Sequence, residues 1–373
     1  MSYRMAYSKT RLSLILITLL AGLSACSQDK VDNKQAASAP ETKATAGYAY
    51  VTSQDAGVSI IDLATMEVVK TIDVKGAGPR GLGVTDDGKK LIVATRENGS
   101  ISVIDTATDE VLQQIPVGQN PEFVRVRGNF AYVSSEPSAK GGPPPKPGEK
   151  AKEDDDDDGE KIPAKISEVD LTTGKKVREI TGGPETEGIE FSADGKNIVI
   201  TNEADNTITV HSIADGSLVK TISTHEFGDR PRGIKVSPDG QTYIATLEFA
   251  NKFLVIDKDF NVVRTVDTAK TPYGVSFDKE GKYIFVAANK DKVLEVFDAK
   301  TYEKVKDIPT GNRCWHFSFT PDDKQIMLAC GKSDAIFVID ANKLEVTKQI
   351  SVKDMPWGIV TYPKSMGSLD TKF

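Results

Sequence analysis

The chain has 373 residues, of which 39% are hydrophobic and 27% are charged, so it can bury a sizeable core as one large domain or two ordinary ones. Its 54 acidic and 47 basic residues leave a formal net charge of −7. This balance argues against nucleic acid as the partner, because a phosphate backbone calls for a basic face.

Residues 1–25 predict a signal peptide. A basic segment precedes an apolar stretch of twelve residues, Leu12–Leu23, which is too short to span a bilayer comfortably. The stretch runs into Leu-Ser-Ala-Cys, which resembles a bacterial lipobox and implies cleavage before Cys26 and diacylation of its sulfur. An ordinary signal peptide with an incidental cysteine is the alternative. Because Ser27 rather than an Asp follows, we expect an outer-membrane anchor and a protein that faces the periplasm.

Residues 26–47 are polar and predict a flexible tether. A repeat of about 42 residues organises the chain beyond them. Each repeat contains four short runs of β-branched and aromatic residues bounded by Gly, Asp, Asn or Pro, which is typical of strands. A Pro-x-Gly-like step recurs in each unit, and its third position is Gly81, Phe123, Gly188, Gly233, Gly274, His316 and Gly358. Four strands in a period of about 40–45 residues indicate a propeller blade.

We therefore predict an all-β fold over residues 48–363, a seven-bladed β-propeller with four-stranded blades, followed by a C-terminal tail at residues 364–373. The chain enters with three strands that lack an innermost partner and leaves with an innermost strand, Pro356–Pro363, that lacks the other three. Joined, the two termini complete one blade and close the ring, so that no sheet edge stays exposed around it. We expect a monomer.

The motifs within the repeat resemble those of a known family. Ala-Tyr-Val-Thr-Ser, Ile-Val-Ile-Thr-Asn and Phe-Ala-Tyr-Val-Ser-Ser are each followed by a Val-Ile-Asp-type strand and a Ser-Pro-Asp-Gly-type turn. This pattern is similar to the YVTN family of β-propeller repeats over nearly all of residues 48–363.

A narrower resemblance concerns the final third of the chain, with FTPDDKQIMLACGKSDAIFVID and then PWGIV. These motifs are similar to secreted propellers associated with PQQ-dependent catabolism. The resemblance implies an accessory role beside quinoprotein alcohol or aldehyde oxidation. Where such relatives carry an apolar residue, Trp and Gln, this chain has Cys314, Trp315 and His316.

Seven side chains are predicted to converge at one mouth of the central channel. The innermost strands of a propeller line its channel, so the residues that follow the Pro-like positions form a ring at one end. They are Arg80, Glu122, Glu187, Arg232, Tyr273, Trp315 and Trp357. We interpret this ring as a recognition site for a partner or small ligand. The alternative is that Arg–Glu bridges between blades and aromatic plugs merely order the channel.

An insertion at residues 136–164 falls between the second and third strands of the third blade, on the same face as the ring. It is rich in Pro, Gly and charge and includes five consecutive aspartates, Asp154–Asp158. Such a composition predicts solvated disorder. An electrostatic docking arm and a weak Ca²⁺ site are alternatives, although EF-hand spacing is absent. A shorter addition, Thr224–Gly233, is expected to shape the rim of the same face.

Cys314 and Cys330 flank a predicted hairpin turn and are expected to face each other, which permits a disulfide in an oxidising compartment. His316 shares the strand face of Cys314, and a Cys-x-His with a facing Cys suits Cu(I) or Zn²⁺ in ligand type. Without a fourth ligand the metal interpretation is weak, and free buried thiols are a third one. His211 and His225 stand alone and are expected to be structural.

These features predict a non-enzymatic, lipid-anchored binding propeller that needs no cofactor and meets a periplasmic protein or small-molecule ligand at its ring. Gly-x-Ser-x-Gly, His-Glu-x-x-His and phosphate-binding glycine loops are absent from the sequence. One alternative is a metal-dependent lactonase-type hydrolase, because propellers of this repeat style include lactone hydrolases. Its divalent ion would be held by Glu122, Glu187 and Asn202.

A second alternative is a single-stranded nucleic-acid binder. Trp315 and Trp357 beside Arg232 fit the combination of aromatic and basic side chains that stacks bases. The net negative charge counts against this alternative.

Overall fold

The computed structural model describes residues 47–75, 78–137 and 161–370, which belong to one compact unit, Ala44–Phe373. The predicted signal peptide with Cys26, the tether up to residue 46 and the acidic run Asp154–Asp158 lie outside these residues. Among the residues that are described, none forms a helix long and apolar enough to cross a bilayer.

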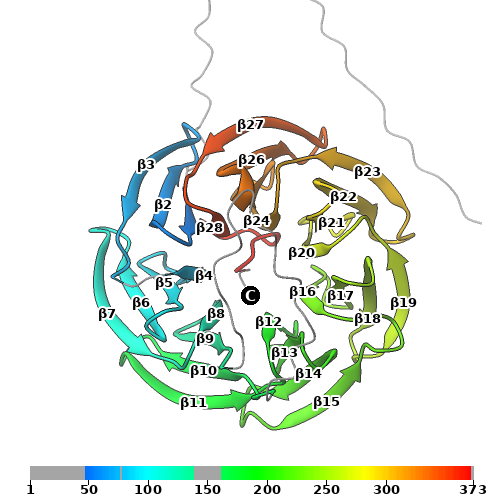
Figure 1. Cartoon of the computed structure of the whole chain (residues 1–373), viewed down its shortest axis with the longest axis horizontal. Helices are drawn as coiled ribbons and strands as arrows, with labels where there is room; N and C mark the ends of the chain where they lie inside the picture. The colour runs from blue at the N-terminus through cyan, green and yellow to red at the C-terminus, as the bar shows by residue number, and fades with distance from the viewer. Residues whose placement is uncertain (1–46, 76–77, 138–160, 371–373) are drawn as a thin grey trace, which may run out of the picture. The chain divides into compact units, whose positions relative to one another are not determined.

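The described chain forms seven four-stranded antiparallel sheets around a central channel, so the predicted all-β, seven-bladed propeller is confirmed (Figure 1). From the innermost strand outward the first four blades are β28 (Pro356–Tyr362), β1 (Tyr48–Ser53), β2 (Gly57–Asp62) and β3 (Glu67–Ile72); β4 (Pro79–Val84), β5 (Lys90–Thr95), β6 (Ser100–Asp105) and β7 (Glu110–Pro116); β8 (Pro121–Arg127), β9 (Phe130–Ser135), β10 (Lys165–Asp170) and β11 (Lys175–Thr181); β12 (Thr186–Phe191), β13 (Asn197–Asn202), β14 (Thr207–Ser212) and β15 (Leu218–Ser223).

The remaining three blades repeat the same order of strands, and a single 3-10 turn, η1 (Gly331–Ser333), interrupts the described strands of the last one. Their strands are β16 (Pro231–Val236), β17 (Thr242–Leu247), β18 (Lys252–Asp257) and β19 (Val262–Asp267); β20 (Pro272–Phe277), β21 (Tyr283–Ala288), β22 (Val293–Asp298) and β23 (Lys304–Pro309); β24 (Cys314–Phe319), β25 (Gln325–Cys330), β26 (Ala335–Asp340) and β27 (Glu345–Ser351).

The two ends of the propeller close the first blade. Strand β28 pairs antiparallel with β1, with Tyr48 opposite Tyr362 and Val51 opposite Ile359. The expected closure by both termini is therefore confirmed. Because the ring is shut by main-chain hydrogen bonds, the blades cannot splay apart at this point without breaking the ladder.

The hydrophobic core lies between neighbouring blades. The second and third strands of each blade are buried, whereas the outermost strand is largely exposed, as β3 shows with five exposed residues out of six. One core cluster joins β5 and β6 of the second blade to β8 and β9 of the third through Ile92, Val103, Val124 and Val133. Each blade buries its two faces against its neighbours, which is why the repeat must continue until the circle closes.

The repeated aspartate of the sequence ends the third strand of a blade and caps the turn that follows. The Asp62 carboxylate accepts hydrogen bonds from the backbone N–H groups of Ala64 and Thr65 at 2.7 and 3.3 Å. The same arrangement recurs at Asp105, Asp170, Asp298 and Asp340. This signature is therefore structural, since an Asp side chain stabilises such turns.

Residues 363–370, which follow β28, turn back into the channel (Figure 1). Ser365, Ser368 and Asp370 are buried there. The sequence predicted a tail at residues 364–373 but gave no sign that it enters the channel. The end of the channel that this tail fills is called the floor below, and the opposite end, where the predicted ring lies, is called the ring face.

Candidate functional site

The seven ring residues occupy the second position of the seven innermost strands. The structure joins them in pairs across blade boundaries. Arg80 donates to Glu122 at 2.5 Å and its guanidinium lies over the Trp357 ring at 5.3 Å. The Tyr273 hydroxyl donates to Glu187 at 3.0 Å, and Tyr273 packs in one apolar cluster with Trp315 and Trp357. These contacts are inter-blade bridges and aromatic plugs, and they order the ring face whatever it binds.

Arg232 is the hub of the ring. Its guanidinium forms ion pairs with Glu187, with Glu203 at 2.5 Å and with Glu248 at 2.5 Å, and it lies over the Tyr273 ring at 4.9 Å. Burial by itself lowers the pKa of Arg232, but the charges of Glu187 and Glu248 outweigh it and raise that pKa. Burial likewise raises the pKa of Glu187, but Arg232 and Arg80 outweigh it, so this carboxyl is held ionised.

A second ring surrounds the first, and the sequence reasoning missed it. Each of its members directly follows the second strand of a blade, so a register signal was present. The members are Gln54, Arg96, Glu136, Glu203, Glu248, Asn289 and Gly331. Glu203 and Glu248 complete the shell around Arg232, and Arg230 pairs with both of them.

Glu136 of this second ring carries an unusual carboxyl. The residue is 4% exposed, and its Oε1 accepts no hydrogen bond from the part of the chain that the structure describes. Burial, followed by the charges of Glu122 and Glu187, raises the pKa of Glu136 well above its usual value. The protonated form is favoured because burial withholds water from the ionised one and the neighbouring carboxylates repel it, which together outweigh the opposing charge of Arg80.

Behind the ring the channel is lined mainly by the glycines of the repeated step, with Phe123 and His316 in the other two places. A Cβ on Gly81 would lie 2.7 Å from the Phe123 Cα, so glycine is needed there for neighbouring innermost strands to approach. His316 is 3% exposed and packs edge-on against Trp357, with ring centroids 4.5 Å apart. Neither of its ring nitrogens has a hydrogen-bond partner among the described residues, and burial lowers its pKa to about 3.

The channel centre leaves very little room. A cavity of about 20 Å³ lies beside His316 and Phe123, with Leu369 of the tail on its floor side. This volume holds about one water molecule. A larger ligand therefore cannot occupy the channel without displacing the tail or the ring.

Cys314 and Cys330 are bonded to each other as a disulfide, and they are direct partners in the β24–β25 register. Because both sulfurs are used in this bond, neither offers a thiolate to a metal ion beside His316. Nowhere in residues 47–75, 78–137 and 161–370 do three His, Cys, Asp or Glu side chains gather to hold a metal. Of the other histidines, His211 is buried near the Gly216 carbonyl, whereas His225 is exposed beside Asp229.

The residues proposed for a lactonase-type metal site are engaged elsewhere. The Glu122 and Glu187 carboxylates pair with Arg80 and Arg232. The Asn202 amide oxygen accepts from the backbone N–H of Gly183 at 2.9 Å, and its nitrogen donates to threonine hydroxyls of the same blade. A divalent ion would have to displace arginines to reach these oxygens.

The aromatic residues considered for base stacking are covered. Trp357 is 1% exposed beneath Arg80, and the Arg313 guanidinium lies over the buried Trp315 ring at 5.3 Å. No face of either indole is free for a nucleobase. Among the described residues of this face, Phe249, which precedes β18, is an exposed aromatic residue.

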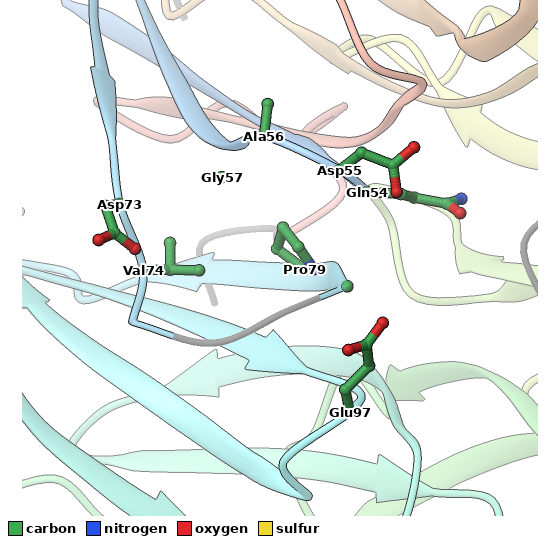
Figure 2. Close-up of a pocket in the computed structure, with 9 residues that line it drawn as sticks. Gln54, Asp55, Ala56, Gly57, Asp73, Val74, Pro79 and Glu97 are labelled. Carbon is green, nitrogen blue, oxygen red and sulfur yellow. The ribbon is translucent and has the colours of Figure 1, made fainter.

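A larger pocket of about 500 Å³ opens between the first two blades beside Pro79 (Figure 2). The side chains of Asp55, Asp73 and Glu97 border it, and Asp73 is paired with Lys75 at 2.9 Å. Three carboxylates would favour a cationic group over an anion here. Sequence reasoning did not find this pocket, because its walls come from three separate turns.

The fold is similar to that of several solved structures. A hydrazine synthase of Kuenenia stuttgartiensis is 20% identical over 76% of this chain and 89% of its own, with a TM-score of 0.64. A functionally unknown protein of Desulfotomaculum acetoxidans is 15% identical over 84% of this chain and 98% of its own, with a TM-score of 0.69. A protein assigned as a 6-phosphogluconolactonase of Bacteroides uniformis is 17% identical over 84% of this chain and 99% of its own, with a TM-score of 0.67. At these identities the likeness concerns the fold alone.

No curated protein matches the chain significantly. The sequence does match a family described as the cytochrome D1 heme domain, over residues 15–128 and 163–295. These two segments make up more than half of the chain, and the gap between them contains most of the predicted insertion. The chain belongs to the cytochrome D1 heme domain family.

Proposed function

We propose that this protein is a non-enzymatic binding propeller whose ring face docks a partner protein. The observation that carries the proposal is the closed ring itself. Its charged and aromatic side chains are fixed by one another, and about 20 Å³ of space lies behind them. Because only this small cavity lies behind the ring side chains, a partner must contact them from outside, and preorganised polar and aromatic groups favour such docking.

The family name implies a heme, and the residues of the channel do not fit one. His316 is buried in the channel, and its ring nitrogens have no hydrogen-bond partner within the described part of the chain, so it is the side chain to consider as an iron ligand. Sites for ligands of that size take about 300–1,000 Å³. The cavity beside His316 has about 20 Å³, and three aromatic rings pack against the imidazole. We therefore derive no step from a heme.

The rim of the ring face supplies an exposed anchor. Phe249 is 60% exposed, and the Arg230 guanidinium lies over its ring at 4.6 Å. Phe227, from the predicted rim addition Thr224–Gly233, packs against the core cluster between the fourth and fifth blades and holds this edge in place. Aromatic and arginine side chains are the residue types that dominate binding energy at protein interfaces.

A photo-crosslinking experiment tests the docking face. We expect a benzoyl-phenylalanine at position 249 to capture a discrete partner in the native cell envelope. The same group at Leu218, which is 59% exposed on the outermost strand β15, is the matched control and should capture none. Equal capture at both positions, or none at position 249, would remove the ring face as the docking site.

We further propose that the docked partner takes part in quinoprotein oxidation. This proposal depends on the resemblance of the final third of the chain to propellers associated with PQQ-dependent catabolism. Mass spectrometry of the product crosslinked at position 249 tests it without a further experiment. A quinoprotein dehydrogenase, or a protein needed to assemble one, supports an accessory role. Any other partner would contradict the role beside quinoprotein oxidation but not the proposal that the ring face docks a protein.

We also propose that Cys26 carries a lipid anchor and that the protein faces the periplasm from the outer membrane. The support is the signal-like segment before Cys26 and the serine after it. Cys26→Ser is expected to move the protein from the washed membrane fraction to the soluble periplasmic one, because the acyl chains are lost. Ser27→Asp is the control and should stay on membranes but shift to the inner one. Retention of Cys26→Ser on membranes would contradict the anchor.

A further inference from the structure

The floor of the channel contains a carboxylate site that the chain fills with its own tail. The Asp370 carboxylate accepts hydrogen bonds from the backbone N–H groups of Val84 and Val126, both at 3.0 Å. It also lies 3.0 Å from the Lys364 ammonium and 3.6 Å from the Arg125 guanidinium. These amides are available because innermost strands have no further strand on their channel side.

The tail backbone is held by polar groups of other blades. Lys235 donates to the Ser368 carbonyl at 2.6 Å, and Ser276 donates to the Gly367 carbonyl at 3.2 Å. The Leu369 N–H donates to the Ser318 hydroxyl at 2.9 Å. Five blades thus contact the tail through its backbone and one carboxylate, and the tail itself turns at Met366–Gly367, where the Ser368 N–H donates to the Ser365 carbonyl at 3.3 Å.

The floor of the channel contains buried charged side chains that would not be needed if the tail only filled the channel permanently. Arg125, Glu190 and Lys235 occupy the same position of three successive innermost strands and are buried with Asp370. Glu190 pairs with Arg125 at 2.8 Å and lies 3.7 Å from Lys235. Buried ion pairs of this kind are commonly no more stable than apolar replacements, so their presence needs another reason. A site that must bind and release a polar segment supplies one.

We propose that the channel floor is a binding site for a short peptide segment that carries a carboxylate side chain, and that residues 364–370 are its exchangeable internal occupant. The inference is independent of the docking face, since it concerns the opposite end of the channel. The tail is held mainly by polar contacts, which is typical of segments that open without global unfolding. Release of the tail removes Leu369 from the cavity beside His316 and opens the channel from the floor.

Hydrogen exchange on the full-length protein tests the release of the tail. The amides of Val84 and Val126 have the Asp370 carboxylate as their acceptor, so they report on the tail and not on the sheets. We expect them to exchange at least about 10-fold faster than the ladder amides of β5 and β9, and with little dependence on mild denaturant. Exchange of these two amides only through global unfolding would overturn the proposal.

Binding of a labelled peptide with the sequence of residues 363–373 tests the site itself. We expect weak, saturable binding to the full-length protein, because the tethered tail competes at high effective concentration. Full-length Asp370→Asn should bind the peptide about 10-fold more tightly, and a peptide with asparagine in place of that aspartate should lose about 10-fold. Succinate, added as a competitor, distinguishes a site for small carboxylates from a site for a peptide. Displacement by succinate at the peptide's own concentration, or no saturable peptide binding to either protein, would overturn a peptide site.

Discussion

Arg232→Ala is expected to lower the free energy of unfolding by about 3–5 kcal/mol, because it removes one partner of a buried ion-pair cluster. The substitution leaves Glu187, Glu203 and Glu248 facing one another with Arg230 as the adjacent cation. Those carboxylates must then protonate or repel. Chemical denaturation at pH 7 measures the loss. The loss should shrink as the pH falls below about 4.5, where glutamates take up protons.

The matched control is Arg264→Ala. Arg264 is exposed on the outermost strand β19, where its guanidinium lies over the Tyr302 ring at 5.2 Å. A single exposed cation–π contact is worth about 0.5–1 kcal/mol. Arg232→Lys should recover only part of the loss, because one ammonium cannot serve three carboxylates as the guanidinium fork does. If Arg232→Ala costs no more than Arg264→Ala, the ring is not held by its ion pairs.

The fold was predictable because each propeller blade corresponds to one sequence repeat of about 42 residues. The repeated step fixed the seven innermost strands, and the incomplete first and last units fixed how the circle closes. The same register located the ring, since Arg80, Glu122 and Arg232 stand in equivalent places of different blades. Arg–Glu bridges between blades were expected as an alternative to recognition, and they are present. The further pairing of Arg232 with Glu203 and Glu248 could not be predicted, because these two carboxylates come from turns outside the repeated step.

The tail and the second ring were missed for two different physical reasons. The second ring has a register signal, but polar residues after a strand are also what an ordinary solvated turn contains. The tail has no signal of its own, because PKSMGSLDTKF lacks both apolar periodicity and strand propensity. The charged residues that bind the tail were also not predicted from the sequence. Arg125, Glu190 and Lys235 point three charges into a channel, and some other part of the molecule must bury them.

The stability of the protein is expected to fall as the pH drops from about 6.5 to about 4.5, and His316 is expected to account for most of the fall in this range. Below it, carboxyls with lowered pKa values, such as Glu187 and Glu190, add to the fall as they protonate. Burial holds the folded-state pKa of His316 at about 3, with Arg80 and Arg232 acting in the same direction and Glu187 against it. The unfolded chain has an ordinary histidine pKa near 6.5 and therefore binds the extra proton in this window. Between pH 7 and pH 4 the difference amounts to about 3 kcal/mol at roughly 1.4 kcal/mol per pH unit.

His316→Phe isolates this contribution. Phenylalanine keeps an aromatic ring beside Phe123, Tyr273 and Trp357 but cannot take up a proton. The variant should match or exceed the wild type at pH 4 and should lose most of the acid dependence, measured as the free energy of unfolding at a series of pH values. Groups with raised folded pKa values, such as Glu136, act in the opposite direction but are present in both proteins, so they cancel in the comparison. The exposed His225 gives the control: His225→Gln should follow the wild-type curve. A wild-type slope that survives in His316→Phe would show that the imidazole is hydrated in the folded protein, and with it that the channel centre is open to water.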